Sequence, residues 1–177
     1  FDIAEELERR DIATQEEFFY LVGYPGVDAS MESHVQPPHD FSDLYPILSS
    51  KPKNLSYEGY LFPDTYFITQ ESTLESIVAR MFENFEDKMG GEIFDEIKRQ
   101  GNDLHEVLTL ASIVQEESPA GEMAKVAGVF TNRLRDGIAL QSDPTVNYIT
   151  GKVTDRPTYD DIEVDSLYNT YRHAGLP

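Results

Sequence analysis

The stretch from Leu104 to Glu117 constrains the fold of this chain more than any other part of its sequence. Its apolar residues recur at helical spacing and cover more than half of the circumference, which is typical of a buried central helix. An Asp103-x-x-Glu106 capping box begins this helix, and Pro119 ends it because proline cannot continue the helical hydrogen bonds. We therefore expect the chain to fold around this helix.

Most of the remaining sequence is also helical in pattern. Capping boxes at Thr14-x-x-Glu17 and Ser72-x-x-Glu75 mark two helix starts. Helices are predicted as a short pair within 2–22, as a short one near 44–48, over about 72–85, 91–100, 121–136 and 159–163, and from Asp143-Pro144 onward. Extended segments are predicted at 60–68, 138–141 and 167–171. The predicted fold class is α+β, a mainly helical domain with a small minor β-sheet at one edge.

Charge and composition exclude several classes of protein. The 177 residues carry 14 Lys and Arg against 33 Asp and Glu, a net charge of −19. Nucleic-acid binding needs a cationic face, so no nucleic-acid partner is expected. The chain has no cysteine, which excludes disulfides, thiol nucleophiles and thiolate metal sites. Its four histidines lack paired spacing on a helix, and no cofactor loop motif occurs, so we expect neither metal nor cofactor.

A polar segment marks the best domain boundary. Residues 24–57 are rich in Pro, Ser, Asp and His and show few periodic apolar positions, as expected of a long connection. No apolar run reaches the roughly 18 residues that a membrane-spanning helix needs. The sequence begins inside a helical pattern and both ends look cut, so a membrane anchor would lie outside this segment.

Two adjacent glutamates at the end of the 104–117 helix are the strongest candidates for chemistry. Glu117 lies on the helix line of Leu110 and Val114, so it is predicted to point toward the core or a cleft, while Glu116 lies on the more polar side. Burial and the negative end of the helix dipole would both favour the protonated carboxyl that a general acid needs. The plain alternative is a helix-end glutamate that bends into solvent.

Other candidates are weaker. The segment 141–145, Gln-Ser-Asp-Pro-Thr, is typical of a helix start with Asp143 as its N-cap. The segment 168–171, Tyr-Asn-Thr-Tyr, offers amide, hydroxyl and aromatic groups that suit a sugar, although an ordinary edge strand would carry them equally well. Glu58 could place a second carboxylate near a site or could simply precede a strand.

These segments together resemble the YceG-like family. The motifs that carry the resemblance occur in the family's order: EGYLFPDTY at 58–66, LASIVQEE at 110–117, VFTNRL at 129–134, LQSDPTV at 140–146, YNTY at 168–171 and GLP at 175–177. The resemblance covers residues 55–177 firmly. Residues 1–23 resemble the helix pair of the family's LysM-like domain. The resemblance implies that the chain has two parts, a LysM-like remnant with linker over 1–50 and a C-terminally truncated catalytic domain over 51–177.

The resemblance implies an enzyme and its site. The family cleaves MurNAc–GlcNAc bonds inside peptidoglycan strands as an endolytic lytic transglycosylase, leaving anhydro-MurNAc ends. Its catalytic glutamate carries over to Glu117, because the family pattern is Glu-x-Glu before a small residue and this chain has Gln115 at the first position. Substrate-binding positions are implied at Glu58, Tyr66, Gln141, Asp143, Thr145, Tyr168, Asn169 and Thr170.

The resemblance also implies a place and partners. Members are anchored by one membrane span and face peptidoglycan on the outer side of the cytoplasmic membrane, close to peptidoglycan synthases. Two other functions stay open at this stage. One is a non-catalytic glycan-binding or scaffold module of the envelope, which would not need Glu117. The other is a pyridoxal-phosphate aminodeoxychorismate lyase, a label this family has carried, although neither Lys125 nor Lys152 lies beside a phosphate-binding loop.

Overall fold

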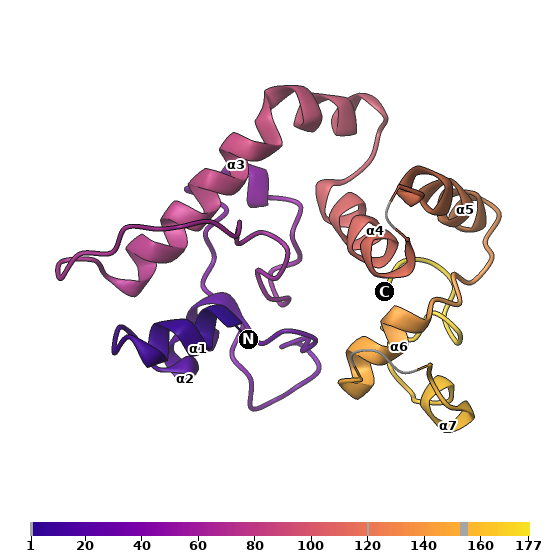
Figure 1. The fold of residues 1–177 in the computed structure, drawn as a ribbon, viewed down its shortest axis with the longest axis horizontal. Helices are drawn as coiled ribbons and strands as arrows, with labels where there is room; N and C mark the ends of the chain where they lie inside the picture. Colours follow the sequence, from indigo (N-terminus) through magenta and orange to yellow (C-terminus); the bar gives the residue numbers. More distant parts are fainter. Residues whose placement is uncertain (1, 120, 153–155) are drawn as a thin grey trace. The chain divides into compact units, whose positions relative to one another are not determined.

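The computed structural model describes residues 2–119, 121–152 and 156–177. The chain forms two compact units, Phe1–Leu104 and His105–Pro177. The first contains α1 to α3, and the second is built from α4 to α7 (Figure 1). The described residues contain helices, turns and irregular segments but no strand, so the fold is mainly helical and the predicted minor β-sheet is absent from them.

The predicted N-terminal helix pair is present as α1 (Asp2–Arg9) and α2 (Gln15–Val22), and the two helices contact each other. The capping box forms as predicted. Thr14 Oγ1 accepts from the backbone N–H of Glu17 at 3.2 Å, and the Glu17 carboxylate accepts from the N–H of Thr14 at 2.8 Å. Gly23 ends α2 with φ +84° and ψ 155°, a conformation that is essentially restricted to glycine.

Aromatic side chains form the core of the first unit. Phe41 lies 5.6 Å from Tyr57 and 5.1 Å from Phe82, measured between ring centroids, and Tyr57 lies 4.9 Å from Phe82. The Tyr57 hydroxyl donates to the carbonyl of His39 at 2.9 Å and accepts from the N–H of Phe41 at 3.0 Å. The segment 24–57 is therefore a connection that packs into the core, and it includes the expected short helix as a 3₁₀ turn, η1 (Pro46–Leu48).

Two predicted helices are joined in α3 (Leu74–Arg99), which changes direction at Gly90 (φ +55°, ψ 158°). The cap of α3 lies one residue later than predicted. Thr73 Oγ1 accepts from the N–H of Ser76 at 3.2 Å, whereas Ser72 Oγ accepts from the preceding loop at Thr69 N–H, 3.1 Å away. The Ser72 side chain is thus used to close the loop before the helix.

The predicted extended segment 60–68 runs beside α3 without becoming a strand (Figure 1). Side chains of α3 contact this segment in the place where a second strand would pair with it. Arg80 donates to the carbonyl of Phe67, and Asn84 donates to the Tyr66 hydroxyl at 3.0 Å. A strand requires a backbone ladder with a neighbour, and these side-chain contacts do not provide one.

The second unit is built on α4 (Leu104–Glu117), α5 (Met123–Arg135), α6 (Asp143–Thr150) and α7 (Tyr159–Ile162), close to the predicted ranges. Its core is formed by four buried side chains of α4, α5 and the loop after α5: Ile113, Val114, Phe130 and Leu140. The prediction that α4 is buried over most of its circumference is wrong, because Ala111 and Ser112 are exposed. Only one face of α4 packs.

The strands predicted at 138–141 and 167–171 are also wrong. These two segments share a single backbone contact, from Gln141 N–H to the Thr170 carbonyl at 3.0 Å. The next N–H, of Ser142, donates to the Thr170 side chain, and Gln141 itself has φ +54°. A left-handed residue and a side-chain acceptor both interrupt a ladder, so the pairing stops after one bond.

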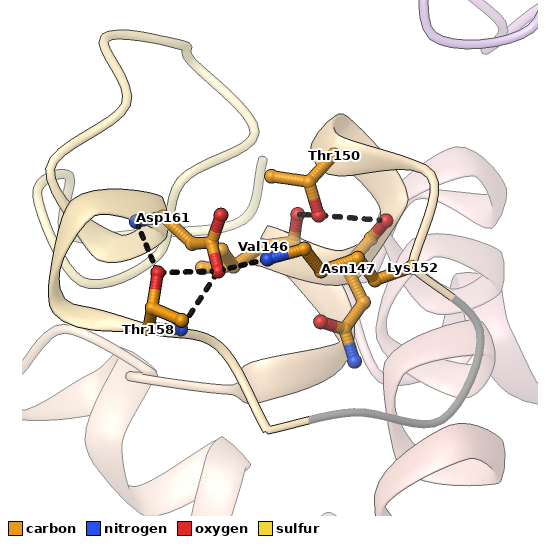
Figure 2. A network of polar contacts seen from close by, with 6 residues as sticks. All are labelled: Val146, Asn147, Thr150, Lys152, Thr158 and Asp161. Atoms are coloured by element: carbon orange, nitrogen blue, oxygen red, sulfur yellow. Dashed lines mark hydrogen bonds and ion pairs between the residues drawn. The ribbon is translucent and has the colours of Figure 1, made fainter.

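A network of polar contacts connects the end of α6 to the start of α7 (Figure 2). Lys152 Nζ lies 2.5 Å from the Asp161 carboxylate, which also accepts from the N–H of Thr158 at 2.7 Å. The Thr158 hydroxyl caps α7 by accepting from the N–H of Asp161 at 3.3 Å. The ion pair with Lys152 and the hydrogen bonds from Thr158 lower the pKa of Asp161 to about 2.

We expect Gly23→Ala to destabilise the first unit by about 2–4 kcal/mol, because a β-carbon there would lie 2.8 Å from the Ser56 Cα in addition to the strain of the backbone angle. Gly59→Ala is the matched control, since Gly59 has a similar φ of +85° with open space around it. Urea unfolding of both variants measures the difference. Equal losses in the two variants would show that the close approach to Ser56 does not matter.

The Lys152–Asp161 pair predicts a specific acid sensitivity. A carboxyl with a depressed folded-state pKa stabilises the fold above its unfolded pKa of 3.8, and this contribution disappears as the pH falls toward 2. Asp161→Asn should therefore lower the melting temperature at pH 6. Between pH 4 and pH 2, the melting temperature of this variant should fall less than that of the parent protein. Asp160→Asn, at the exposed neighbouring position, should retain the parent's profile. Parallel profiles for Asp161→Asn and the parent would contradict this assignment.

Candidate functional site

Glu117 is the last residue of α4, and its side chain is exposed. Glu117 was expected to point toward the core or a cleft, and its exposure shows that it does not point into the core. Its carboxylate is nevertheless held, since the Ser142 hydroxyl donates to Glu117 Oε2 at 3.0 Å. The candidate acid therefore has one oxygen oriented by a protein donor while the side chain remains accessible.

Ser142 is the N-cap of α6 and is only 1% exposed. The sequence prediction of Asp143 as the cap is wrong by one residue. The Ser142 hydroxyl makes no capping bond to α6, so it is available for Glu117. The Ser142 backbone is fixed on both sides: its N–H donates to Thr170 Oγ1 at 3.0 Å, and its carbonyl accepts from Thr145 Oγ1 at 2.8 Å.

Thr145 and Thr170 form a buried hydroxyl pair, 2.8 Å apart, with exposures of 5% and 1%. Proton counting fixes the direction of their bond. Thr145 uses its one hydroxyl proton on the Ser142 carbonyl, so Thr170 must donate to Thr145. The Thr170 oxygen in turn accepts from the Ser142 N–H. We call this arrangement of Ser142, Thr145 and Thr170 the hydroxyl frame.

Two further residues hold the segments of the frame in place. Asn169 is fully buried, and its amide donates to the carbonyls of Ile162 at 2.9 Å and Val164 at 2.8 Å. Arg133 of α5 donates to the Leu140 carbonyl at 2.9 Å and to Gln141 Oε1 at 3.3 Å. The 139–141 loop and the 169–171 turn are thereby attached to α5 and to the end of α7.

Asp143 follows Ser142 and is half-buried. Its Oδ1 accepts from the Tyr171 hydroxyl at 2.6 Å. Burial and the hydrogen bond to the Asp143 carboxylate raise the pKa of Tyr171 to about 12, and the charges of Asp143 and Glu117 add to this rise. Tyr171 therefore keeps its proton at neutral pH and serves as a donor to Asp143.

The remaining predicted residues lie around the frame or in the other unit. Tyr168 is half-buried and packs against Tyr148, with ring centroids 5.4 Å apart. Glu58 is exposed, and Tyr66 is half-buried with its hydroxyl donating to the Phe62 carbonyl at 2.6 Å. Glu58 and Tyr66 belong to the first unit and Glu117 to the second. A shared role with Glu117 stays a prediction for these two residues.

The second unit thus brings Glu117, Ser142, Asp143 and Tyr171 into one connected site. Ser142 and Tyr171 lie inside the quoted motifs, but the sequence offered no signal for their roles because their partners are 25 and 28 residues away. Such a site can donate and accept a proton at Glu117. Within the described ranges, no cluster of three or more His, Asp or Glu side chains could hold a metal ion, and none of the helices there is long and apolar enough to cross a membrane.

Known proteins are similar to this chain in sequence and in fold. The YceG-like family pattern matches residues 1–177. The endolytic murein transglycosylase of Bacillus subtilis (strain 168) is 42% identical over 129 residues, which are 70% of this chain and 35% of that protein. The protein of the same name from Streptococcus pneumoniae serotype 2 (strain D39) is 38% identical over 125 residues, 67% of this chain and 22% of that protein.

A crystal structure of a yceG-like protein from Listeria monocytogenes superimposes with a TM-score of 0.78 at 31% identity, covering 99% of this chain and 57% of that one. This chain spans between about a fifth and a third of the length of the curated relatives it matches. The family pattern covers the whole sequence and the fold agrees with that of a related chain. This chain belongs to the YceG-like family.

Proposed function

We propose that this chain carries the catalytic part of an endolytic murein transglycosylase, which cuts MurNAc–GlcNAc bonds within peptidoglycan strands and leaves anhydro-MurNAc ends. The observation that carries the proposal is the Glu117–Ser142 contact at 3.0 Å, which joins an accessible carboxyl to a buried, fixed donor. Both residues lie in motifs of the YceG-like family, and the relatives named above are endolytic murein transglycosylases.

A single carboxyl is sufficient for the proton transfers of this reaction. Ordinary glycosidases need two, one as the acid and a second as the base or nucleophile. In a lytic transglycosylase the nucleophile is the primary hydroxyl of the MurNAc residue itself, so no water has to be activated. The reaction rearranges atoms of the substrate without consuming a co-reactant.

Glu117 acts twice in the proposed sequence. The protonated Glu117 carboxyl first donates its proton to the glycosidic oxygen as the bond from the anomeric carbon to that oxygen breaks, which releases the GlcNAc hydroxyl. The C6 hydroxyl of MurNAc then bonds to the anomeric carbon, and the Glu117 carboxylate accepts the hydroxyl proton. The enzyme ends in its starting protonation state. Ser142 orients one oxygen of Glu117, leaving the other for the substrate.

Different roles are proposed for the other predicted residues. Gln141 is exposed and Tyr168 half-buried, which suits contact with the glycan. Thr145, Asn169 and Thr170 are buried, and their polar side-chain atoms bond to protein groups, so we assign them to positioning of Ser142. Contacts of Glu58 and Tyr66 with the glycan remain part of the proposal on the strength of their motif.

The wider setting follows from the substrate. Peptidoglycan lies in the cell envelope, so we propose that the site faces the wall on the outer side of the cytoplasmic membrane. An anchor and proximity to peptidoglycan synthases are proposed from the family resemblance. We also propose that α1 and α2 are the helix pair of a LysM-like module with its boundary near residue 50, because both helices form where that resemblance lies.

Glu117→Gln should reduce the formation of anhydro-muropeptides at least about 1000-fold, because the amide can neither donate nor accept the required proton. The measurement is mass spectrometry of purified peptidoglycan strands digested by the full chain. Glu116→Gln is the matched control at the adjacent exposed carboxylate and should keep activity within about threefold. Full activity in Glu117→Gln would refute the assignment, and a parent protein that binds glycan without cutting it would favour the non-catalytic binding module.

Ser142→Ala tests the donor alone. It removes the bond to Glu117 but leaves the Ser142 backbone bonds to Thr145 and Thr170 intact, so the fold should persist. Loss of one hydrogen bond to a carboxylate should lower kcat about 10-fold with little change in KM. Ser112→Ala, at an exposed position on α4, is the control. An unchanged kcat in Ser142→Ala would mean that the contact has no part in catalysis.

A further inference from the structure

Asp143 presents a carboxylate that the frame does not use. Tyr171 holds its Oδ1 at 2.6 Å, and no described residue donates to its Oδ2. Asp143 is half-buried, so it is neither a core residue nor a freely solvated one. A carboxylate with one oxygen fixed and the other available is suited to acting on a bound molecule.

Asp143 and Glu117 belong to the same site by two independent connections. Ser142, the residue directly before Asp143, donates to the Glu117 carboxylate. The charge of Glu117 also contributes to the raised pKa of Tyr171, the donor to Asp143, while the positive charge of Arg133 acts in the opposite direction. The Glu117 carboxylate of α4 is therefore hydrogen-bonded to Ser142, and the second carboxylate belongs to the next residue, Asp143, at the start of α6.

We propose that Asp143 is a second catalytic residue, an ionised carboxylate held by Tyr171 that stabilises the positive charge at the anomeric carbon while the glycosidic bond breaks. This inference rests on the proposed function of Glu117 and adds a role to it. Asp143 forms no bond to the sugar, so the atom balance of the reaction is unchanged. Tyr171 is a positioning residue, because it acts through Asp143.

The physical chemistry favours this role over simple substrate binding. The transition state of glycoside cleavage carries a partial positive charge that the ground state lacks. A fixed charge aimed at that position stabilises the transition state selectively and therefore raises kcat more than affinity. Tyr171 keeps its proton at neutral pH because its pKa is raised to about 12, so its hydroxyl remains the donor that fixes the Asp143 carboxylate.

The test compares Asp143→Asn, Tyr171→Phe and the double variant in the full chain, with kcat and KM measured for anhydro-muropeptide formation. We expect kcat to fall about 100-fold in Asp143→Asn and about 10-fold in Tyr171→Phe, with KM within threefold of the parent. The double variant should be no worse than Asp143→Asn, because Tyr171 acts only through Asp143. Asp160→Asn and Tyr159→Phe, both at exposed positions of α7, are the matched controls.

Three results overturn the inference. These are a kcat within threefold of the parent in Asp143→Asn, a loss confined to KM, or losses that multiply in the double variant. If Asp143→Asn melts early, Tyr171→Phe decides, because it removes one hydroxyl and leaves the carboxylate in place. An active parent with an inactive Glu117→Gln and an undamaged Asp143→Asn would reject only this inference. A parent that forms no anhydro product would reject the proposed function together with it.

A spectroscopic measurement tests the pair without any turnover. The ultraviolet titration of tyrosine, with Tyr171→Phe subtracted from the parent, isolates the ionisation of Tyr171, whose pKa is raised to about 12. In Asp143→Asn this pKa should fall but stay above the ordinary value of 10, because the Asp143 charge and hydrogen bond are lost while burial, the largest cause of the rise, remains. An unmoved titration would show that Tyr171 and Asp143 are not coupled.

Discussion

The hydroxyl bond between Thr145 and Thr170 is the interaction on which the site depends. It is buried, it is 2.8 Å long, and each hydroxyl also bonds to the backbone of Ser142. Loss of either hydroxyl would leave buried polar groups without partners, which costs more than the bond itself contributes. The start of α6 is therefore fixed against the 169–171 turn, and the Ser142 hydroxyl is directed at Glu117 as a consequence.

This arrangement separates Glu117, the proposed acid, from the groups that orient it. Glu117 is exposed at the end of α4, where a substrate can reach it, while Ser142 and the two threonines are buried. A fully buried acid would exclude a polymer, and a fully solvated one would have no fixed orientation. Holding one carboxylate oxygen with a buried donor satisfies both requirements, and catalytic groups work best when their supporting shell is rigid.

The sequence predicted most helices but missed the contacts that make the site. Local signals, such as the capping box of Thr14 and the glycine after α2, identify helix ends because they act within a few residues. The strands near 140 and 170 were wrongly predicted because the local sequence did not reveal the positive φ of Gln141. Helical spacing placed Glu117 on the apolar line of α4 but gave no account of the missing next turn. The partners of Ser142 and Tyr171 are distant in sequence, so no local pattern could supply them.

The net charge of −19 raises the question of why one more carboxylate should matter at the site. Distance and burial decide it. At physiological salt, charges farther apart than about 8 Å are largely screened when water lies between them, so most surface carboxylates contribute little to the potential at Glu117. Asp143 is half-buried and directly follows the residue that binds Glu117, so screening of its charge is weaker. A local, oriented charge can therefore act on the reaction where the overall acidity of the chain cannot.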